Sequence, residues 1–405
     1  MKTWSSTRYE LPAIALLSAL LTTIVFFTTL RITRSFPLYN LGTMDHHRYV
    51  MMAEGNPFDF HLAPFSWRIL MPALVKLLPF GTEIGFLLIT LICLCLSGVL
   101  LYYIVRAAGF TYEYSLFGIL LFFSMGWLTK QYIFDFWLPD VPAIAFILAA
   151  IYAIYKKHDL LFLVLLTIGV LAKETVIFVI PLYYSLNALR LFDWPLLRRT
   201  TLFAIPPAII LILLRLAIPA LNGDPAYLAL LPATMTLNPI YEQVPYSFAY
   251  MLQTIGAERL QGLTPYNVGY RYLIFPLNVA PLALPLLALR QVAPVLLRYS
   301  PYLILVYAQL LIAANTERLV SLAFPPLIIM SVVAVRKVMT DLKLKPLWAL
   351  LLPTSLFLLG TLDTDPEWSY LSTSWQFIIV LISFALLAFV FVYRRNEARN
   401  SISSA

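Results

Sequence analysis

Residues 11–30 read LPAIALLSALLTTIVFFTTL, a continuous apolar run without a single charged side chain. A helix needs about 20 such residues to cross the roughly 30 Å hydrocarbon core of a bilayer. Lys2 and Arg8 precede the run, but no small-residue cleavage site follows it. We therefore expect a retained first membrane helix rather than a signal peptide that is removed.

The rest of the chain resembles this run in composition. Apolar residues make up 61% of the 405 residues and charged residues only 12%, whereas an ordinary water-soluble domain has about 25% charged residues. The apolar residues come in long blocks and do not alternate with polar ones as in barrel strands. Because a helix satisfies its own backbone hydrogen bonds in lipid, the sequence predicts an all-α integral membrane protein.

Hydropathy divides the chain into about twelve transmembrane helices that form a single polytopic membrane domain over residues 1–405. The predicted spans are residues 11–30, 83–105, 114–129, 141–155, 159–172, 175–189, 200–219, 270–289, 300–315, 319–335, 347–361 and 375–393. With both termini in the cytoplasm, most Lys and Arg residues fall on the cytoplasmic side and most Asp and Glu residues outside. Topology thus explains the net charge of +8, and nucleic acid is not an expected partner.

Two predicted extracytoplasmic segments, 31–82 and 221–269, are long enough to carry function. Within the first, residues 66–79 have apolar side chains at three- and four-residue spacing, which predicts an interfacial helix lying flat on the outer surface. The second is rich in Pro, Tyr and Asn and has no core of its own. We expect it to cap the membrane body.

The densest polar cluster follows the first span. It consists of Asp45, His46, His47, Arg48 and Tyr49, with Glu54, Asp59, His61 and Arg68 further along the loop. A carboxylate beside imidazoles can act as a general base, bind a divalent cation, or belong to an ordinary solvated loop. Neighbouring histidines cannot both face one ion from a regular helix, so the metal site is the weakest of the three interpretations.

Further ionisable residues lie in other predicted outside hairpins. Asp135 and Asp140 lie in a hairpin rich in aromatic residues. This hairpin is either an ordinary aromatic belt at the membrane interface or part of a functional site. Two very tight hairpins place Lys173-Glu174 and Glu317-Arg318 at membrane depth, where charges are costly unless they pair or face a cavity. Lys173 and Arg318 are of the type that binds a lipid phosphate, although simple structural ion pairs are an equal alternative.

These motifs resemble the GT-C superfamily of polytopic glycosyltransferases, which includes aminoarabinose transferases and protein mannosyltransferases. The resemblance rests on the order of elements and on four stretches of sequence. They are Asp45 to Ala53 followed by an interfacial helix, Asp135 to Ala143, Gly169 to Glu174, and Glu317-Arg318-Leu319 leading into Pro325-Pro326.

The resemblance implies transfer of a sugar from a polyprenyl-phosphate donor to an acceptor on the extracytoplasmic face of the plasma membrane. Asp45 would be the catalytic base, and Arg68, Lys173 and Arg318 would bind the donor phosphate. The remaining candidates would position an acceptor or a cation: His46, His47, Arg48, Tyr49, Asp135, Asp140, Glu174 and Glu317. Many members have a second acid where His46 and His47 stand here, which puts a divalent cation in doubt.

Three other functions fit parts of the pattern. Many apolar helices also suit a transporter or a flippase for lipid-linked sugars, although no internal symmetry is visible in the sequence. An O-antigen ligase or polymerase would place its site in the second long loop, with Arg259 and Arg271. A structural subunit of an envelope assembly would need none of these residues for chemistry.

Overall fold

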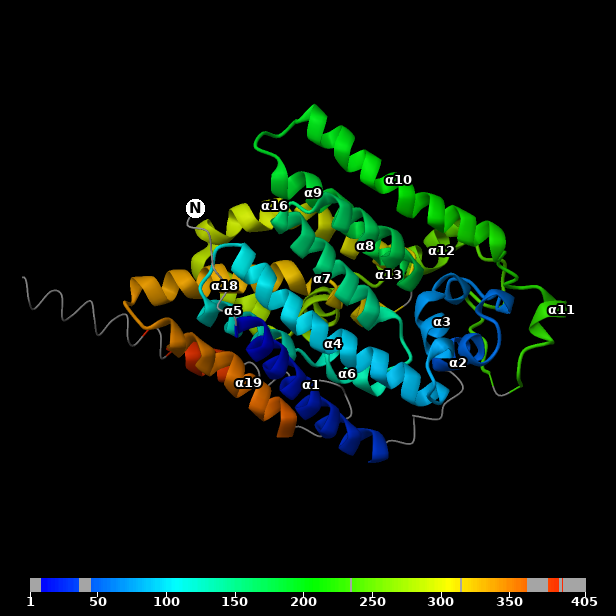
Figure 1. Cartoon of the computed structure of the whole chain (residues 1–405), viewed down its shortest axis with the longest axis horizontal. Helices are drawn as coiled ribbons and strands as arrows, with labels where there is room; N and C mark the ends of the chain where they lie inside the picture. The colour runs from blue at the N-terminus through cyan, green and yellow to red at the C-terminus, as the bar shows by residue number, and fades with distance from the viewer. Residues whose placement is uncertain are drawn as a thin grey trace, which may run out of the picture.

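The structure is a computed structural model that describes residues 9–35, 45–233, 235–313, 315–362, 378–385 and 388, and residues 31–35 by their backbone only. All regular secondary structure in the described residues is helical, so the predicted all-α class is confirmed. Figure 1 shows the long helices running in broadly one direction, with α10 along one edge.

The centre of the molecule is the helix α7 (Asp140–Lys156), which packs against α4 (Thr82–Ala107) and α8 (Asp159–Ala172). Small residues of α7, such as Ala143 and Ala150, are fully buried and let the neighbouring helices approach closely. The helix α1 (Glu10–Ser35) covers the other side of α4. Asp140, at the first turn of α7, is thereby held in the interior.

The remaining elements complete the bundle and its loops. They are α5 (Tyr112–Phe123), η4 (Gly126–Leu128), α6 (Lys130–Phe134), η5 (Glu174–Val179), α9 (Ile180–Asn187), α10 (Trp194–Ala217), α11 (Pro225–Leu228), α12 (Phe248–Met251), η6 (Leu252–Gly256), α13 (Ala257–Gln261), η7 (Asn267–Ile274), α14 (Phe275–Leu277), α15 (Val279–Ala283), η8 (Leu284–Ala288), α16 (Leu289–Ala308), η9 (Gln309–Leu311), α17 (Thr316–Ser321), α18 (Phe324–Asp341), η10 (Pro346–Leu350) and α19 (Leu351–Leu362).

The prediction of about twelve spans is not supported. Among the described residues, four helical stretches are long and apolar enough to cross a membrane. A fifth is counted if α5 and the η4–α6 segment, bent by 83°, form one broken span. The four stretches are Glu10–Leu30, Thr82–Ala107, Trp194–Ala217 and Val279–Leu311. Most of the predicted span 375–393 lies outside the described residues.

Length and burial explain the difference. At 1.5 Å per residue, the 14 residues of α8 extend only about 21 Å. The predicted span 175–189 is divided between the short elements η5 and α9. Helix α7 is 17 residues long, and 12 of these residues are buried against other helices. Hydropathy does not distinguish a helix covered by protein from one that faces lipid.

From Asp45 onward, the first long loop folds into short helices, among them α2 (His46–Glu54), η2 (Pro57–Asp59), η3 (Phe65–Trp67) and α3 (Leu70–Leu77). The predicted helix 66–79 is therefore confirmed only over Leu70–Leu77, and Arg68 lies in the break before it. On α3, Met71 and Val75 are buried whereas Leu77 is 81% exposed. An exposed apolar face is what an interfacial helix presents to lipid.

The second long loop lies against the first at one end of the molecule, where Figure 1 shows α11 beside α2 and α3. The Asn222 side chain donates to the Ala63 carbonyl at 2.9 Å and accepts from the Ala63 N–H at 2.8 Å. The Leu221 N–H donates to the His61 carbonyl at 2.9 Å. These bonds fix the start of one loop on the middle of the other, over the ends of the helices.

Candidate functional site

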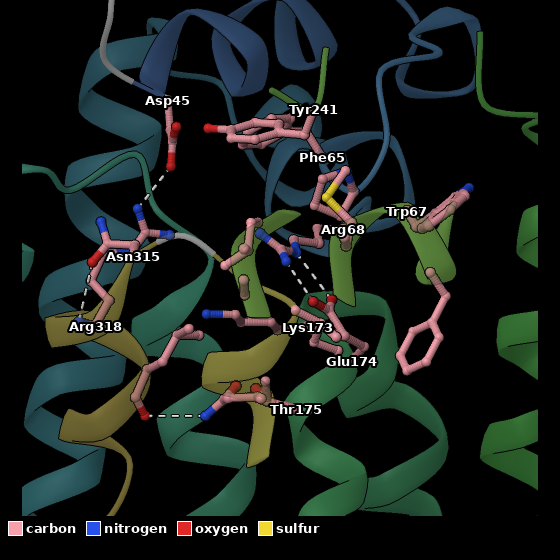
Figure 2. Close-up of a pocket in the computed structure, with 18 of the residues that line it drawn as sticks. Asp45, Phe65, Trp67, Arg68, Lys173, Glu174, Thr175, Tyr241, Asn315 and Arg318 are labelled. Carbon is pink, nitrogen blue, oxygen red and sulfur yellow. Dashed lines mark hydrogen bonds and ion pairs between the residues drawn. The ribbon is translucent and has the colours of Figure 1, made fainter. Parts of the chain in front are cut away.

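A cavity of about 780 Å³ lies beneath the two long loops (Figure 2). Its walls come from both loops, from the turn after α8, from α10 and from the segment that begins α17. The charged and aromatic lining residues are Asp45, Phe65, Trp67, Arg68, Lys173, Glu174, Phe178, Arg215, Tyr241, Tyr246, Phe248, Arg271, Glu317 and Arg318. The cavity thus combines segments that are far apart in the sequence.

The predicted catalytic base, Asp45, meets the three predicted phosphate-binding residues, Arg68, Lys173 and Arg318, in this cavity. Three further residues singled out in the sequence, Glu174, Arg271 and Glu317, also line it. In all, five cationic side chains and three carboxylates line it. A cleft with an excess of one sign attracts ligands of the other sign, because low-dielectric walls focus the field. The charge balance therefore favours an anionic ligand.

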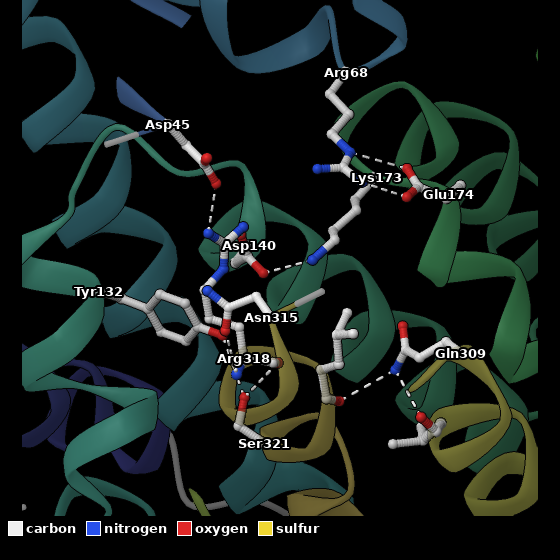
Figure 3. A network of polar contacts seen from close by, with 12 residues as sticks. Asp45, Arg68, Tyr132, Asp140, Lys173, Glu174, Gln309, Asn315, Arg318 and Ser321 are labelled. Atoms are coloured by element: carbon white, nitrogen blue, oxygen red, sulfur yellow. Dashed lines mark hydrogen bonds and ion pairs between the residues drawn. The ribbon is translucent and has the colours of Figure 1, made fainter. Parts of the chain in front are cut away.

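Arg318 is the centre of a buried ion-pair network on one side of the cavity (Figure 3). Its Nη1 donates to Asp45 Oδ2 at 2.7 Å and its Nη2 to Asp140 Oδ2 at 3.1 Å. Lys173 Nζ donates to the other oxygen of Asp140 at 2.6 Å. Burial raises the pKa of the Asp140 carboxyl, but Arg318 and Lys173 together hold this pKa well below its usual range. Asp140 is thus an anion that anchors two cations.

The helix start of α17 aims Arg318 into this network. The Asn315 side chain accepts a hydrogen bond from the Arg318 N–H at 3.3 Å and so caps the helix. Arg318 Nε is buried and has no hydrogen-bond partner among the described residues. One donor of the guanidinium is therefore unsatisfied in this structure.

Arg68 forms a second ion pair on the opposite side of the cavity. Its Nε donates to Glu174 Oε2 at 3.0 Å and its Nη2 to Glu174 Oε1, while Nη1 donates to the Tyr49 hydroxyl at 3.3 Å. The Glu174 side chain is 37% exposed, so this pair opens to the cavity. Arg68 lies at the turn between η3 and α3, where its backbone N–H donates to the Phe65 carbonyl at 3.0 Å.

The adjacent charges of the two tight hairpins do not pair with each other. Lys173 binds Asp140 and Glu174 binds Arg68, while Arg318 binds Asp45 and Asp140. Glu317 accepts a hydrogen bond from Arg271 Nε at 3.1 Å. Each hairpin is therefore tied to distant segments, and all four hairpin residues face the cavity.

Several predicted positioning residues are not among the cavity-lining residues. His46 stacks on His47, with ring centroids 4.1 Å apart, and burial lowers the pKa of the His46 imidazole to about 4. Tyr49 is fully buried behind Arg68. Arg48 is buried and forms a two-point ion pair with Glu242, at 2.7 and 2.6 Å. These residues therefore stabilise the loops rather than contact the cavity.

Asp135 is a buried carboxylate for which the described residues provide no hydrogen bond or ion pair. It is 7% exposed. Burial is the main reason that its pKa is raised to about 7, with Asp45 and Asp140 adding to the rise and Arg318 opposing it. Neither Asp135 nor Asp140 lines the cavity, but Asp140 binds Lys173 and Arg318, which do.

The histidine and acid clusters do not form a metal site in the part of the chain that the structure describes. No group of three or more His, Cys, Asp or Glu side chains there is arranged to hold an ion. The possible divalent cation thus has no candidate ligand set in these residues.

The sequence did not single out the aromatic side of the cavity. Trp67 is held by Arg215, whose guanidinium lies 4.6 Å from the ring centroid, and by a 3.0 Å hydrogen bond from Nε1 to the Ile218 carbonyl. Tyr241 comes from the second long loop, and Thr175 has a buried hydroxyl without a partner among the described residues. The only hint in the sequence was the abundance of Tyr and Pro in the second loop.

Comparisons with known proteins add no identification. No protein-family model matches the sequence, and no curated protein matches it either.

Proposed function

We propose that the protein is a membrane glycosyltransferase of the GT-C type that uses a polyprenyl-phosphate-linked sugar. The observation that carries the proposal is the cavity that brings Asp45 together with Arg68, Lys173 and Arg318. A carboxylate and several cations around one space are the groups that such a transfer requires.

The proposed reaction is a single displacement. The acceptor hydroxyl oxygen attacks the anomeric carbon, its proton goes to Asp45, and a new carbon–oxygen bond forms. The bond from the anomeric carbon to the phosphate oxygen breaks, and the phosphate leaves with the electron pair. Arg68, Lys173 and Arg318 stabilise the negative charge that develops on the leaving phosphate, since cationic donors in a dry site act strongly on such charge.

Arg318 links the two halves of this proposal. In this structure its guanidinium donates a hydrogen bond to Oδ2 of Asp45, so that oxygen is engaged with a cation. A phosphate that binds Arg318 competes for the same donors. Donor binding therefore loosens Asp45 from its partner and makes it available as a base.

The surroundings of the cavity suit a lipid donor. Leu211 and Arg215 of α10 line it, and only 17% of the apolar window of α10 is buried. A polyprenyl chain can therefore lie along α10 in the membrane while its phosphate enters between the cations. We place the cavity on the extracytoplasmic face of the plasma membrane, with the N-terminus inside, because the basic residues Lys2 and Arg8 precede the first span.

A ligase or polymerase of lipid-linked glycans is the second candidate. Arg271, which that function would use, also lines the cavity and pairs with Glu317. Arg259 is not among the lining residues. The two functions differ in whether Asp45 or Arg271 is essential.

The test uses the full chain in lipid nanodiscs with polyprenyl-phosphoryl mannose, glucose and arabinose, and with octyl glucoside or a short serine peptide as acceptor. We expect transfer to fall at least about 100-fold in Asp45→Asn, because general base catalysis contributes roughly that much. Asp59→Asn is the matched control, since Asp59 is exposed in the same loop and outside the cavity.

Three outcomes contradict the proposal. Absence of transfer by the wild-type protein removes the enzyme assignment, and movement of the lipid without bond cleavage indicates a transporter. Transfer that survives in Asp45→Asn and is lost in Arg271→Gln favours the second candidate.

A further inference from the structure

Tyr241 lies across the upper part of the cavity from Asp45, and its hydroxyl points toward that carboxylate (Figure 2). Arg318 binds only Oδ2 of Asp45. Among the described residues, neither the Tyr241 hydroxyl nor Asp45 Oδ1 makes a hydrogen bond. The two free groups therefore face the same space.

The position of Tyr241 is fixed from both sides. Its own carbonyl accepts a hydrogen bond from Asn222 Nδ2 at 2.7 Å, and Asn222 is in turn bonded to Ala63. The next residue, Glu242, is fully buried and binds Arg48, which lies one helical turn after Asp45 on α2. The Glu242 carboxylate also accepts from the Asn238 N–H at 2.6 Å. The Arg48–Glu242 pair thus places the segment around Tyr241 beside the start of α2.

The aromatic side of the cavity continues from Tyr241. The rings of Phe65 and Tyr241 are 6.4 Å apart, and those of Trp67 and Tyr246 are 5.3 Å apart. These rings lie on the loop side, and Lys173 and Arg318 reach the cavity from the helices. Aromatic faces favour apolar surfaces such as the C–H faces of sugars, and a hydroxyl adds directional hydrogen bonding.

We propose that Tyr241 positions the acceptor hydroxyl, so that the acceptor lies under the second long loop between the Tyr241 hydroxyl and Asp45. This inference rests on the proposed function and names the alcohol acceptor and its subsite. In this arrangement the acceptor oxygen accepts a hydrogen bond from Tyr241 and donates its own proton toward Asp45. Burial and the nearby Asp45 raise the pKa of Tyr241 to about 12, so the phenol keeps its proton at neutral pH.

The experiment compares the kinetics of wild type, Tyr241→Phe and Tyr266→Phe in nanodiscs, with the donor and acceptor probes named above. Tyr266 belongs to the same loop, is 69% exposed and does not line the cavity, which makes it a matched control. Loss of one neutral hydrogen bond is worth about 0.5–1.5 kcal/mol. We therefore expect kcat/KM for the acceptor to fall about 2- to 10-fold in Tyr241→Phe, with the donor KM and the unfolding temperature unchanged.

The result separates this inference from the proposed function. If wild type transfers sugar and both variants have the same kinetics as wild type, the role of Tyr241 is refuted and the enzyme assignment remains. An equal change in donor and acceptor KM, or a lowered unfolding temperature, assigns Tyr241 a structural role instead. If wild type transfers no sugar, the proposed function fails and this inference fails with it.

Discussion

Two arginine–glutamate pairs connect distant segments at the same end of the molecule, yet their surroundings differ. The Arg48–Glu242 pair joins the two long loops and is almost completely buried, with 2% and 0% of the side chains exposed. The Arg68–Glu174 pair has the same two-point geometry, but Glu174 is 37% exposed and both residues line the cavity. The comparison teaches that ion-pair chemistry alone does not reveal function. Access to a cavity distinguishes a structural tie from a pair that a ligand can rearrange.

The largest expected effect comes from breaking the buried pair. We predict that Glu242→Gln lowers the free energy of unfolding by about 3–5 kcal/mol, because it leaves the buried Arg48 cation without its counter-charge. Glu174→Gln is the matched substitution in the open pair, and we expect a clearly smaller loss, because the Glu174 side chain is 37% exposed even though Arg68 is buried. Thermal unfolding of both variants in one detergent measures the difference. Equal losses in the two variants would remove the distinction between the pairs.

Asp135, a buried acid to whose carboxylate the described residues give no hydrogen bond or ion pair, provides a second contrast. Because burial raises the pKa of Asp135 to about 7, the folded state holds a proton that the unfolded state releases near pH 4. The contribution of Asp135 is fully present below about pH 4 and is lost as pH rises to about 7. We expect wild type to lose on the order of 1 kcal/mol per pH unit in this window relative to Asp135→Asn. Parallel stability curves for the two proteins would show that Asp135 titrates normally.

The third prediction concerns ligand binding by the open pair. Arg68→Gln should weaken binding of polyprenyl monophosphate by about 1.5–3 kcal/mol, roughly 10- to 100-fold, through loss of charge-assisted hydrogen bonds. Glu174→Gln should preserve or strengthen this binding, since it removes a carboxylate that competes for Arg68. Titration of each purified variant with the lipid measures the affinities. Unchanged binding in Arg68→Gln would exclude Arg68 from the phosphate site.

The sequence predicted the features that depend on neighbouring residues in the chain, and it did not predict those that depend on contacts between distant segments. Helix positions follow from local apolar runs, so the all-α class and the first span at residues 11–30 agree with the structure. The number of spans was overestimated, since α7 and α8 are apolar but too short, and α7 is surrounded by protein. Burial by neighbouring helices is a tertiary property that a hydropathy window does not contain.

The same difference between local features and long-range contacts applies to the candidate site. Lys173 and Arg318 were identified because tight hairpins between apolar runs leave charges at depth, where they need partners or a cavity. Tyr241 and Glu242 were missed because their importance comes from Asp45 and Arg48, which lie almost 200 residues earlier in the chain. The sequence around residues 241–242 contains no feature that predicts these long-range contacts. The same holds for Arg215, which acts on Trp67 from another segment.

The most direct measurement is an experimental structure of the full chain in nanodiscs with bound polyprenyl phosphate. We predict that the phosphate lies among Arg68, Lys173 and Arg318, that Arg318 turns from Asp45 toward it, and that the lipid chain leaves along α10. A phosphate bound elsewhere, with the Asp45–Arg318 pair unchanged, would contradict the account.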